Sequence, residues 1–401
     1  MTTMSKKELI SAIKSRYIKA DKKSKGQILD EFCQNTRYNR SYATRILQPG
    51  YDHQRVAHQG RRRRQRKYDS AVIMAVIKIW EVLDYPCGAR LQPMINPMLE
   101  VLVRQGELKL NETTIALLKT ISAKTLDRRL KRERVIRRLN KNRGTTRHGS
   151  LLKSSIPIRI TDWDTAKVGF MEIDTVAHNG GDPSGEFIYS LDMVEIYSGW
   201  SEQMAVLGKG EKGIAQAVNT VKIEQPFTLL GLDSDNGGEF INYHLVRYCQ
   251  GENIYFTRSR PDRKNDNAYV EQKNYTHIRR WLGYGRFDNA QQLKLINNLY
   301  RRELRLYNNF FRPVMKIISK AKINNSVCRK TYDTAKTPYQ RLLESNQINQ
   351  EQKQKLTEIY LSLNPIQLKL AVDQKIKKIR ATQTYKLNVP TRQGKLTFLN
   401  V

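Results

Sequence analysis

The sequence predicts a multidomain chain: N-terminal all-α helix-turn-helix units, then an α/β core with a mixed sheet and helices on both faces, then a small C-terminal helical and β region. Three observations support this class. Apolar residues recur at helical spacing up to about residue 134 and at strand spacing from about residue 165. The chain has 401 residues, enough for several domains. Its net charge of +33 is concentrated toward the N-terminus.

The composition excludes several classes of protein. Hydrophobic residues make up 39% of the chain and charged residues 27%, which is typical of a globular protein rather than a disordered one. The four cysteines form no CxxC pair and no histidine has a cysteine pair near it, so we expect neither disulfides nor zinc. The N-terminal segment has no apolar signal core, and no run of about 20 apolar residues occurs, so we expect a cytoplasmic, nucleoid-associated protein with no membrane contact.

The charge is distributed unevenly. Residues 1–150 contain 34 Lys and Arg against 13 Asp and Glu, whereas residues 151–330 contain 25 against 20. A strongly basic region favours binding to a polyanion, most often nucleic acid. The alternative is a basic surface that contacts only solvent. A nearly balanced region with clustered acids is where metal chemistry is expected. The sequence therefore predicts DNA contact at the front of the chain and a chemical site in its middle.

Residues 1–48 are predicted to form a first helix-turn-helix unit. Apolar residues at helical spacing indicate three short helices, and the outer face of the third one is basic. A basic last helix is typical of units that read DNA, so we expect Arg40 and Arg45 to contact DNA. The alternative is an ordinary three-helix bundle.

Residues 49–67 are predicted to be a basic linker. Pro49 and Gly50 end the preceding helix, and a run of Arg and Lys follows. Such a run is solvated when it stands alone, but it grips phosphates when it is tethered between DNA-binding units, and it can enter the minor groove of A·T-rich DNA. The residues of this run that we expect to contact DNA are Arg61, Arg62, Arg63 and Arg64.

Residues 68–134 are predicted to form a second helix-turn-helix-like unit, and residues 135–164 a basic connector. Ser122 can cap the last helix of this unit, in which Leu126 and Leu130 face inward. The remaining positions of the helix are mostly basic, which favours DNA binding. The expected DNA contacts are Lys124, Arg128 and Arg129.

Residues 165–312 are predicted to form the α/β core. Three successive strands are expected, at residues 168–174, 187–194 and 200–207. Helices and strands then alternate, with a helix at 211–221, a strand at 227–233, a helix at 240–249, a strand at 254–257, and helices at 267–282 and 289–311. The strand at 227–233 is a near-continuous apolar run, as expected for a strand that is buried on both faces.

Residues 313–401 form a C-terminal region whose role the sequence leaves open. Helices are expected near residues 337–343, 349–362 and 366–380, and two short strands at 385–389 and 395–399. We interpret this region either as a small DNA-binding module or as a structural brace.

Three acidic residues of the core stand in positions that favour chemistry. Asp174 is expected to end a strand, Asp235 follows the buried strand, and Glu271 lies early in a helix, with 35 residues between Asp235 and Glu271. Acids at strand ends project from the edge of a sheet where ligands bind. Phosphodiesters are anionic and resist attack, and two divalent ions held by carboxylates can activate the nucleophile and stabilise the leaving oxygen.

The residues around these acids resemble those of the DDE transposases of bacterial insertion sequences, which have a retroviral-integrase-like catalytic core. The resemblance rests on Glu-Ile-Asp174-Thr, Ser-Asp235-Asn-Gly-Gly-Glu-Phe, Asn-Ala-Tyr-Val-Glu271-Gln-Lys-Asn and the 35-residue gap, and it covers roughly residues 165–312. It implies a ribonuclease-H-like fold. It also implies that Asp174, Asp235 and Glu271 are catalytic and bind Mg²⁺ or Mn²⁺, with two ions expected.

The resemblance further implies a function. A transposase of this kind binds the inverted-repeat ends of a mobile element, hydrolyses DNA 3′ ends and transfers the strands into target DNA. The implied partners are double-stranded DNA, both transposon ends and target, and further copies of the chain in a homodimer or homotetramer. Two alternatives are a DNA-binding regulator with a non-catalytic core, and a ribonuclease-H-type nuclease without strand transfer.

One position departs from the family pattern. Many relatives carry a basic residue seven positions after the catalytic glutamate, where it holds the transposon end, and here that position is Ile278. Other basic residues lie on the same predicted helix and in the loop before it. The expected DNA contacts in this part of the chain are Lys273, Arg279 and Arg280 on the helix, and Arg263 and Lys264 in the loop.

Overall fold

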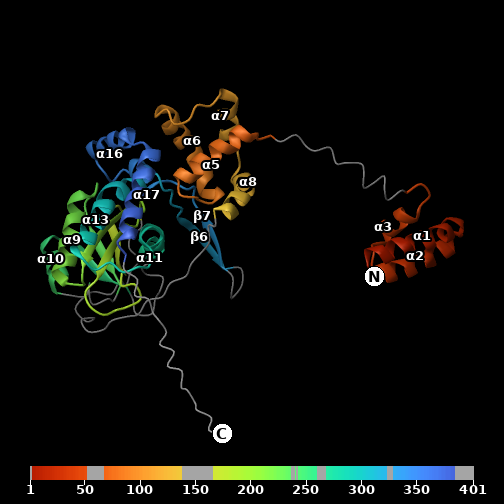
Figure 1. Cartoon of the computed structure of the whole chain (residues 1–401), viewed down its shortest axis with the longest axis horizontal. Coiled ribbons are helices and arrows are strands. Elements are labelled where there is room, and N and C mark those ends of the chain that lie inside the picture. The colour runs from red at the N-terminus through yellow and green to blue at the C-terminus, as the bar shows by residue number, and fades with distance from the viewer. Residues whose placement is uncertain are drawn as a thin grey trace, which may run out of the picture. The chain divides into compact units, whose positions relative to one another are not determined.

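The structure, a computed structural model, describes residues 2–51, 67–137, 166–235, 240, 243–259, 268–322 and 328–383. The chain divides into two compact units, Met1–Lys67 and Tyr68–Val401, and each is described by itself. Figure 1 shows the helices and strands of both units in chain order. Within the described residues, no helix is long and apolar enough to cross a membrane.

The first unit consists of three helices, α1 (Thr3–Lys19), α2 (Lys22–Thr36) and α3 (Arg40–Leu47). Arg37 has a left-handed backbone φ of 59°, and the Asn39 side chain accepts the N–H of Ser41 at 2.9 Å, so the chain turns between α2 and α3 and restarts at a capped helix. The three expected helices are confirmed, and a DNA-reading role for them stays a prediction. The core of the unit is Ile10, Tyr17, Ile28, Leu29, Phe32, Ala43, Ile46 and Leu47.

The second unit begins with four helices, α5 (Ser70–Val82), α6 (Gly88–Arg104), α7 (Glu112–Lys119) and α8 (Ala123–Ile136). Ser122 caps α8 as expected, because its hydroxyl accepts the N–H of Thr125 at 3.3 Å. Leu126 and Leu130 are fully buried, which confirms the inward face expected for this helix.

A five-stranded mixed sheet follows, with strand order β3-β2-β1-β4-β5. Its strands are β1 (Phe170–Ala177), β2 (Ile188–Glu195), β3 (Ser201–Leu207), β4 (Gly231–Ser234) and β5 (Tyr255–Arg258). The first three strands pair antiparallel, and β4 and β5 join β1 in parallel. Three consecutive strands followed by alternating helices and strands are the order that the sequence predicts for the core.

Two strand boundaries were wrong: the strand expected at 227–233 begins only at Gly231, and the other boundary is at Asp174. Asp174 was expected to end its strand, but β1 continues to Ala177, which pairs with Tyr189 of β2. The antiparallel ladder with β2 extends the strand beyond the point where the parallel pairing with β4 stops at Ile173 and Ser234. Asp174 therefore lies inside β1, level with the end of β4.

Helices cover the sheet at the expected places. They are α9 (Glu211–Glu224), α10 (Tyr243–Gly251), α11 (Ala268–Lys273), α12 (Arg280–Leu282), α13 (Ala290–Leu299) and α14 (Arg305–Phe310). The two long helices expected near 267–282 and 289–311 are present, but each contains a π-helical segment, η1 (Asn274–Arg279) and η2 (Tyr300–Leu304). These segments were not predicted, and π-helical segments are frequent at functional sites.

The C-terminal region contains a hairpin that the sequence analysis missed. Strands β6 (Ile317–Lys322) and β7 (Cys328–Tyr332) pair antiparallel in a separate two-stranded sheet. Helices α15 (Pro338–Glu344), α16 (Gln350–Ser362) and α17 (Pro365–Ala381) follow, as expected. The short strands expected at 385–389 and 395–399 lie outside the described residues.

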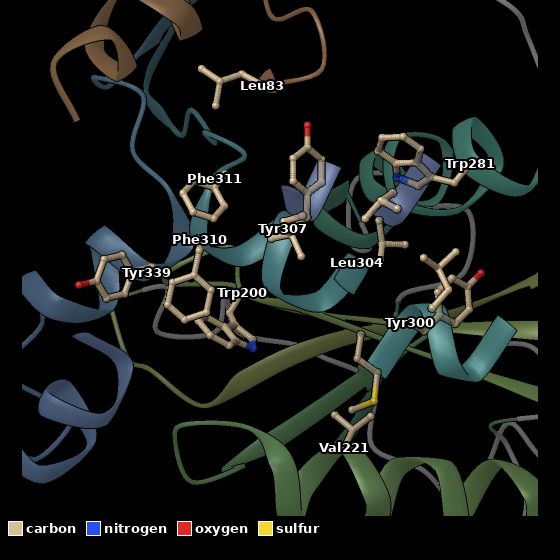
Figure 2. Close-up of a cluster of buried hydrophobic side chains, with 14 of the residues drawn as sticks. Leu83, Trp200, Val221, Trp281, Tyr300, Leu304, Tyr307, Phe310, Phe311 and Tyr339 are labelled. Atoms are coloured by element: carbon tan, nitrogen blue, oxygen red, sulfur yellow. The ribbon is translucent and has the colours of Figure 1, made fainter. Parts of the chain in front are cut away.

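An aromatic core joins the helical region to the sheet. Figure 2 shows Tyr307, Phe310 and Phe311 lying between Leu83, at the end of α5, and Trp200, at the start of β3. The Tyr307 hydroxyl donates to the carbonyl of Val82 at 2.6 Å. Helices α5–α8 thus pack with the sheet in one compact unit. The boundaries expected within this unit, at 68–134, 165–312 and 313–401, stay predictions.

Two asparagine side chains form hydrogen bonds with backbone groups of the edge strand β3. The Asn297 side chain of α13 donates to the carbonyl of Ala205 at 2.9 Å and accepts its N–H at 2.7 Å. The Asn309 side chain of α14 forms the same pair of bonds with Ser201, both at 2.8 Å. Because β3 is an edge strand, its outward N–H and C=O groups would otherwise be unpaired and open to aggregation.

We expect Asn309→Leu to lower the free energy of unfolding by about 2–5 kcal/mol, because it leaves the buried N–H and C=O of Ser201 unpaired. Chemical denaturation measures the effect. The control is Asn298→Ala, which changes a neighbouring exposed asparagine and should cost much less. Equal stabilities of the two variants would contradict the role given to Asn309.

Candidate active site

Acidic side chains gather on one face of the central sheet. Residues two apart on a strand point to the same face, so Glu172 and Asp174 share a face of β1. Asp192 of β2 lies directly opposite Asp174, and Asp233 of β4 lies beside Glu172. Asp235 comes two residues after Asp233 and therefore continues the row next to Asp174. The sheet register places these five carboxylates on one face of the sheet.

Asp174 and Asp235 interact strongly. Burial, followed by the negative charge of Asp235, raises the pKa of Asp174 to about 7. Two hydrogen bonds oppose this rise: the side-chain amide of Asn274 donates to Asp174 Oδ2 at 2.6 Å, and the N–H of Thr175 donates to Oδ1 at 2.7 Å. The pair is therefore a site in which two neighbouring carboxylates repel each other.

Asp192 adds another carboxylate to this face. It is fully buried, and burial raises its pKa to about 7, although Gln203 donates to its Oδ1 at 2.9 Å and the charge of Lys273 partly lowers its pKa. Its Oδ2 and the Oδ1 of Asn274 are buried and, within the described part of the chain, accept no hydrogen bond. Oxygen ligands with unused lone pairs, beside carboxylates that repel each other, fit a hard divalent cation.

Glu271 is placed differently from the two aspartates. It is exposed in α11, three residues before Asn274 and therefore on the same side of the helix. Within the described residues, no group of three or more His, Cys, Asp and Glu side chains is arranged to hold a metal ion. The structure thus brings Asp174 and Asp235 together, and a shared site that includes Glu271 stays a prediction.

Glu172 fixes the start of the helix that carries Glu271. Its Oε2 accepts the N–H groups of Tyr269 at 2.8 Å and Val270 at 3.0 Å, which lie in the first turn of α11. These are N–H groups that a helix leaves without internal partners, and a carboxylate there also interacts favourably with the helix dipole. The sequence analysis gave Glu172 no such role, although its place two residues before Asp174 puts it on the acidic face.

A buried basic side chain on this helix interacts with the acidic face. Burial, followed by the positive charge of Arg312, lowers the pKa of Lys273 to about 7, and the charge of Asp192 opposes this fall. The Lys273 Nζ lies 3.4 Å from Nε2 of His277, a buried residue whose pKa is also lowered well below its usual range by burial. A cavity of about 50 Å³ adjoins these side chains, and its lining consists of Arg90, Gln272, Lys273, Thr276, His277, Arg312, Pro313 and Val314.

The π-helical segment explains the departure at Ile278. Hydrogen bonds in a π turn run from residue i to i+5, one residue further than in an α-helix, so positions after the turn are displaced by one. The residue that returns to the face of Glu271 is then Arg279 rather than Ile278. Ile278 is fully buried, and Arg279 donates to the carbonyl of Ala177, the last residue of β1, at 2.7 Å.

The basic residues expected to contact DNA on this helix have partners inside the protein. Lys273 is buried, Arg279 bonds to β1, and Arg280 donates to Asp84 Oδ1 at 2.8 Å. DNA contact by these three side chains stays a prediction, and it would require them to leave these partners. Arg263 and Lys264 lie outside the described residues, as do Arg61, Arg62, Arg63 and Arg64.

The helical units present further basic side chains. On α3, Arg40 is exposed and forms an ion pair with Asp30, and Arg45 is exposed with its guanidinium 5.4 Å from the ring centre of Tyr42. On α8, Lys124 and Arg128 are exposed and Arg129 is half-buried. Their surface positions are compatible with phosphate contact, which stays a prediction.

Comparison with known proteins gives a relative of similar length. No protein-family model matches the chain. The uncharacterized protein y4rM of Sinorhizobium fredii is 36% identical over 324 residues, which span 80% of this chain and 91% of that protein. The crystal structure of the catalytic core domain of BIV integrase is similar over 44% of this chain and 94% of that domain, with 18% identity and a TM-score of 0.30. A likeness this low does not by itself establish a shared function.

We expect Asp174→Asn to stabilise the metal-free protein at pH 8. The pKa of Asp174 is raised in the folded state from its usual 3.8 to about 7, so the unfolded state loses this proton first and stability falls as pH rises from about 4 to 7. Asn removes the charge, and the gain at pH 8 should be about 2–4 kcal/mol and clearly larger than at pH 5. Denaturation at both pH values in chelator measures it. A loss of stability, or a gain that does not depend on pH, would contradict the charge imbalance.

We expect Glu172→Ala to loosen the first turn of α11, because the N–H groups of Tyr269 and Val270 lose their acceptor. Amide hydrogen exchange should accelerate at residues 269–273 in particular. Glu172→Gln is the matched control, since it keeps an acceptor oxygen at the same reach and should restore most of the protection. Unchanged exchange in the alanine variant would show that other contacts position this helix.

Proposed function

The chain belongs to the same protein family as y4rM of Sinorhizobium fredii, and we propose that it is a DDE transposase, a metal-dependent polynucleotidyl transferase that acts on DNA ends. In this proposal the protein binds the inverted-repeat ends of a mobile element, hydrolyses the DNA 3′ ends and joins them to target DNA. In its more general form, the proposal is that the chain is a nucleic-acid-processing enzyme with an integrase-like core.

One observation carries the proposal: Asp174 and Asp235 lie side by side, on β1 and directly after β4, and the negative charge of Asp235 helps to raise the pKa of Asp174. Structural carboxylates in protein interiors are normally paired with basic groups. The side-chain amide of Asn274 and the backbone N–H of Thr175 donate to Asp174, and neither donor carries a charge. Two carboxylates that repel each other lower the stability of the fold. Carboxylates with perturbed pKa values gather at functional sites, so we infer that this pair has a function.

Asp174, Asp235 and Glu271 are the residues that would hold divalent ions, Mg²⁺ or Mn²⁺. The orphaned oxygens of Asp192 and Asn274 beside Asp174 support this assignment. When bound, such ions supply a nucleophile at neutral pH and stabilise charge on the attacking and leaving oxygens of a phosphodiester. Glu271 would complete the site by joining the two aspartates from the exposed side of α11.

The remaining residues have supporting roles in this proposal. Glu172 and Asn274 position the helix that carries Glu271 relative to β1. Arg40 and Arg45 on α3, together with Lys124, Arg128 and Arg129 on α8, would contact the transposon ends. The arginines at 61–64 and the pair at 263 and 264 would bind phosphates of the same DNA. Joining two ends to one target would require a homodimer or homotetramer.

We expect Asp235→Asn to abolish Mg²⁺-dependent cleavage and strand joining of DNA that carries the repeats flanking the gene. Loss of several kcal/mol of charge stabilisation corresponds to about a thousandfold lower rate. Asp373→Asn, at an exposed position on α17, is the matched control and should react at the wild-type rate. Labelled oligonucleotide products resolved on a gel report both steps.

The products of the same assay separate the alternatives. A ribonuclease-H-type nuclease would release cleaved products and no joined ones. A DNA-binding regulator would bind the repeats and produce neither, whatever metal is supplied. Joining that proceeds equally well with Asn at position 235 would refute the assignment of the site.

A further inference from the structure

The hairpin formed by β6 and β7, here called the β-ribbon, is almost wholly exposed. Every residue of it whose side chain the structure describes is exposed: Ile317, Ile318, Ser319, Ala321, Arg329, Lys330, Thr331 and Tyr332. In Figure 1 the two strands form an arm separate from the five-stranded sheet. A two-stranded ribbon that packs on nothing is only marginally stable in water. We therefore expect a binding partner to stabilise the β-ribbon.

The base of the β-ribbon is firmly attached. Val314 and Lys336 exchange backbone hydrogen bonds at 2.8 and 3.1 Å. Asp333 accepts the N–H of Lys316 at 2.7 Å and forms an ion pair with Arg341 at 2.7 Å. Arg341 also donates to the carbonyl of Val314 at 3.0 Å. The arm therefore has a fixed direction at its root and exposed strands beyond it.

The base also lies next to the helix of the candidate active site. Arg312, five residues before β6, donates to the carbonyl of Thr276 in η1 at 3.0 Å. It also forms an ion pair with Asp84 at 3.5 Å, and its side chain is largely buried. The root of the β-ribbon thus contacts η1, which continues the helix that carries Glu271.

The charge of the β-ribbon identifies the partner as a polyanion. Residues 316–336 contain six Lys and Arg and one acid, Asp333, which is used at the base. Lys320 stands directly opposite Lys330 in the strand register. Like charges at opposed positions of antiparallel strands are destabilising, so this arrangement weakens the free ribbon. An anionic partner removes that cost.

We propose that the β-ribbon binds duplex DNA by entering its major groove, with Arg329 and Lys330 on the phosphates at the groove edge. The inference rests on the proposed function and names the surface that holds DNA beside its site. Two strands about 4.8 Å apart, with their side chains, fit a major groove about 12 Å wide. Six residues of β6 reach about 20 Å, roughly six nucleotides along one strand. The narrow major groove of A-form RNA excludes such a ribbon.

The test is DNA binding by the full chain as a function of salt. The variant Arg329→Gln/Lys330→Gln removes two cations from the exposed part of β7, and the control Lys377→Gln/Lys378→Gln removes two adjacent exposed cations from α17. Fluorescence anisotropy with a B-form duplex should give a salt slope that is smaller by about 1–2 in the ribbon variant, with affinity about tenfold or more lower at low salt. The control should stay within about twofold of wild type. Equal slopes for wild type and ribbon variant, or equal losses in the ribbon variant and the control, would overturn the proposal.

A single substitution separates binding from folding. Lys330→Thr removes one of two opposed like charges, so its melting temperature should equal or exceed that of wild type while its DNA affinity falls. A fall in both quantities would mean that Lys330 acts by holding the fold, which would refute the proposal. The same duplex sequence made as RNA should bind with a salt slope that these substitutions leave unchanged, and an equal change on RNA would refute the major-groove assignment.

Failure of the β-ribbon proposal and failure of the proposed function give different results. Asp235→Asn should lose strand joining while it keeps wild-type DNA affinity and the wild-type salt slope. The ribbon variant should show the opposite result: its DNA affinity should be lower, and strand joining should return to the wild-type level when the protein saturates the DNA. Recovered joining with unchanged affinity would overturn the β-ribbon proposal alone.

Discussion

The concentration of negative charge on one face of the central sheet is the constraint on which the rest of this structure depends. Strand register alone places Asp174 opposite Asp192 and next to Asp235. Burial raises the pKa of both Asp174 and Asp192 to about 7, so neither carboxylate gives up its proton easily. The repulsion on this face lowers the stability of the fold. The aromatic core between α5, β3 and α14 stabilises the same unit.

The helix above this face is held at several points. Glu172 binds its first turn, Asn274 ties its middle to Asp174, and Arg280 joins its end to Asp84. These contacts link the acidic strand, the π-helical segment and the α5–α6 connection into one frame. Glu271 stands on this frame while its own side chain remains exposed. The site is therefore rigid where it must be aligned and open where ligands and DNA would enter.

Much of this arrangement follows from local sequence patterns. The five strands of the sheet and the helices between them were predictable, because apolar periodicity changes sharply near residue 165 and each strand is bounded by turn residues. Asp235 was placed correctly after β4 because an apolar run ends immediately before it. The three helices of the first unit were predictable for the same reason. In each case the information lies within a few neighbouring residues.

Features that depend on distant partners were not predictable. The β1 strand extends past Asp174 because β2 continues to pair with it, which no local pattern reveals. The amides of Asn297 and Asn309 look like ordinary helix-surface residues until β3 is found beside them. The π-helical segments shift the helix faces by one residue, and the β-ribbon lacks the apolar alternation that marks a half-buried strand.

Proton release on Mn²⁺ binding tests the central claim most directly. Calorimetric titration of the DNA-free, full-length protein at pH 6, in buffers of different ionisation enthalpy, gives the number of protons displaced per ion. With the pKa of Asp174 and Asp192 at about 7, wild type should bind Mn²⁺ saturably and release close to one proton or more, and Asp174→Asn should release about one fewer or fail to bind. Saturable binding with no proton release, or with the same release in Asp174→Asn, would contradict the account.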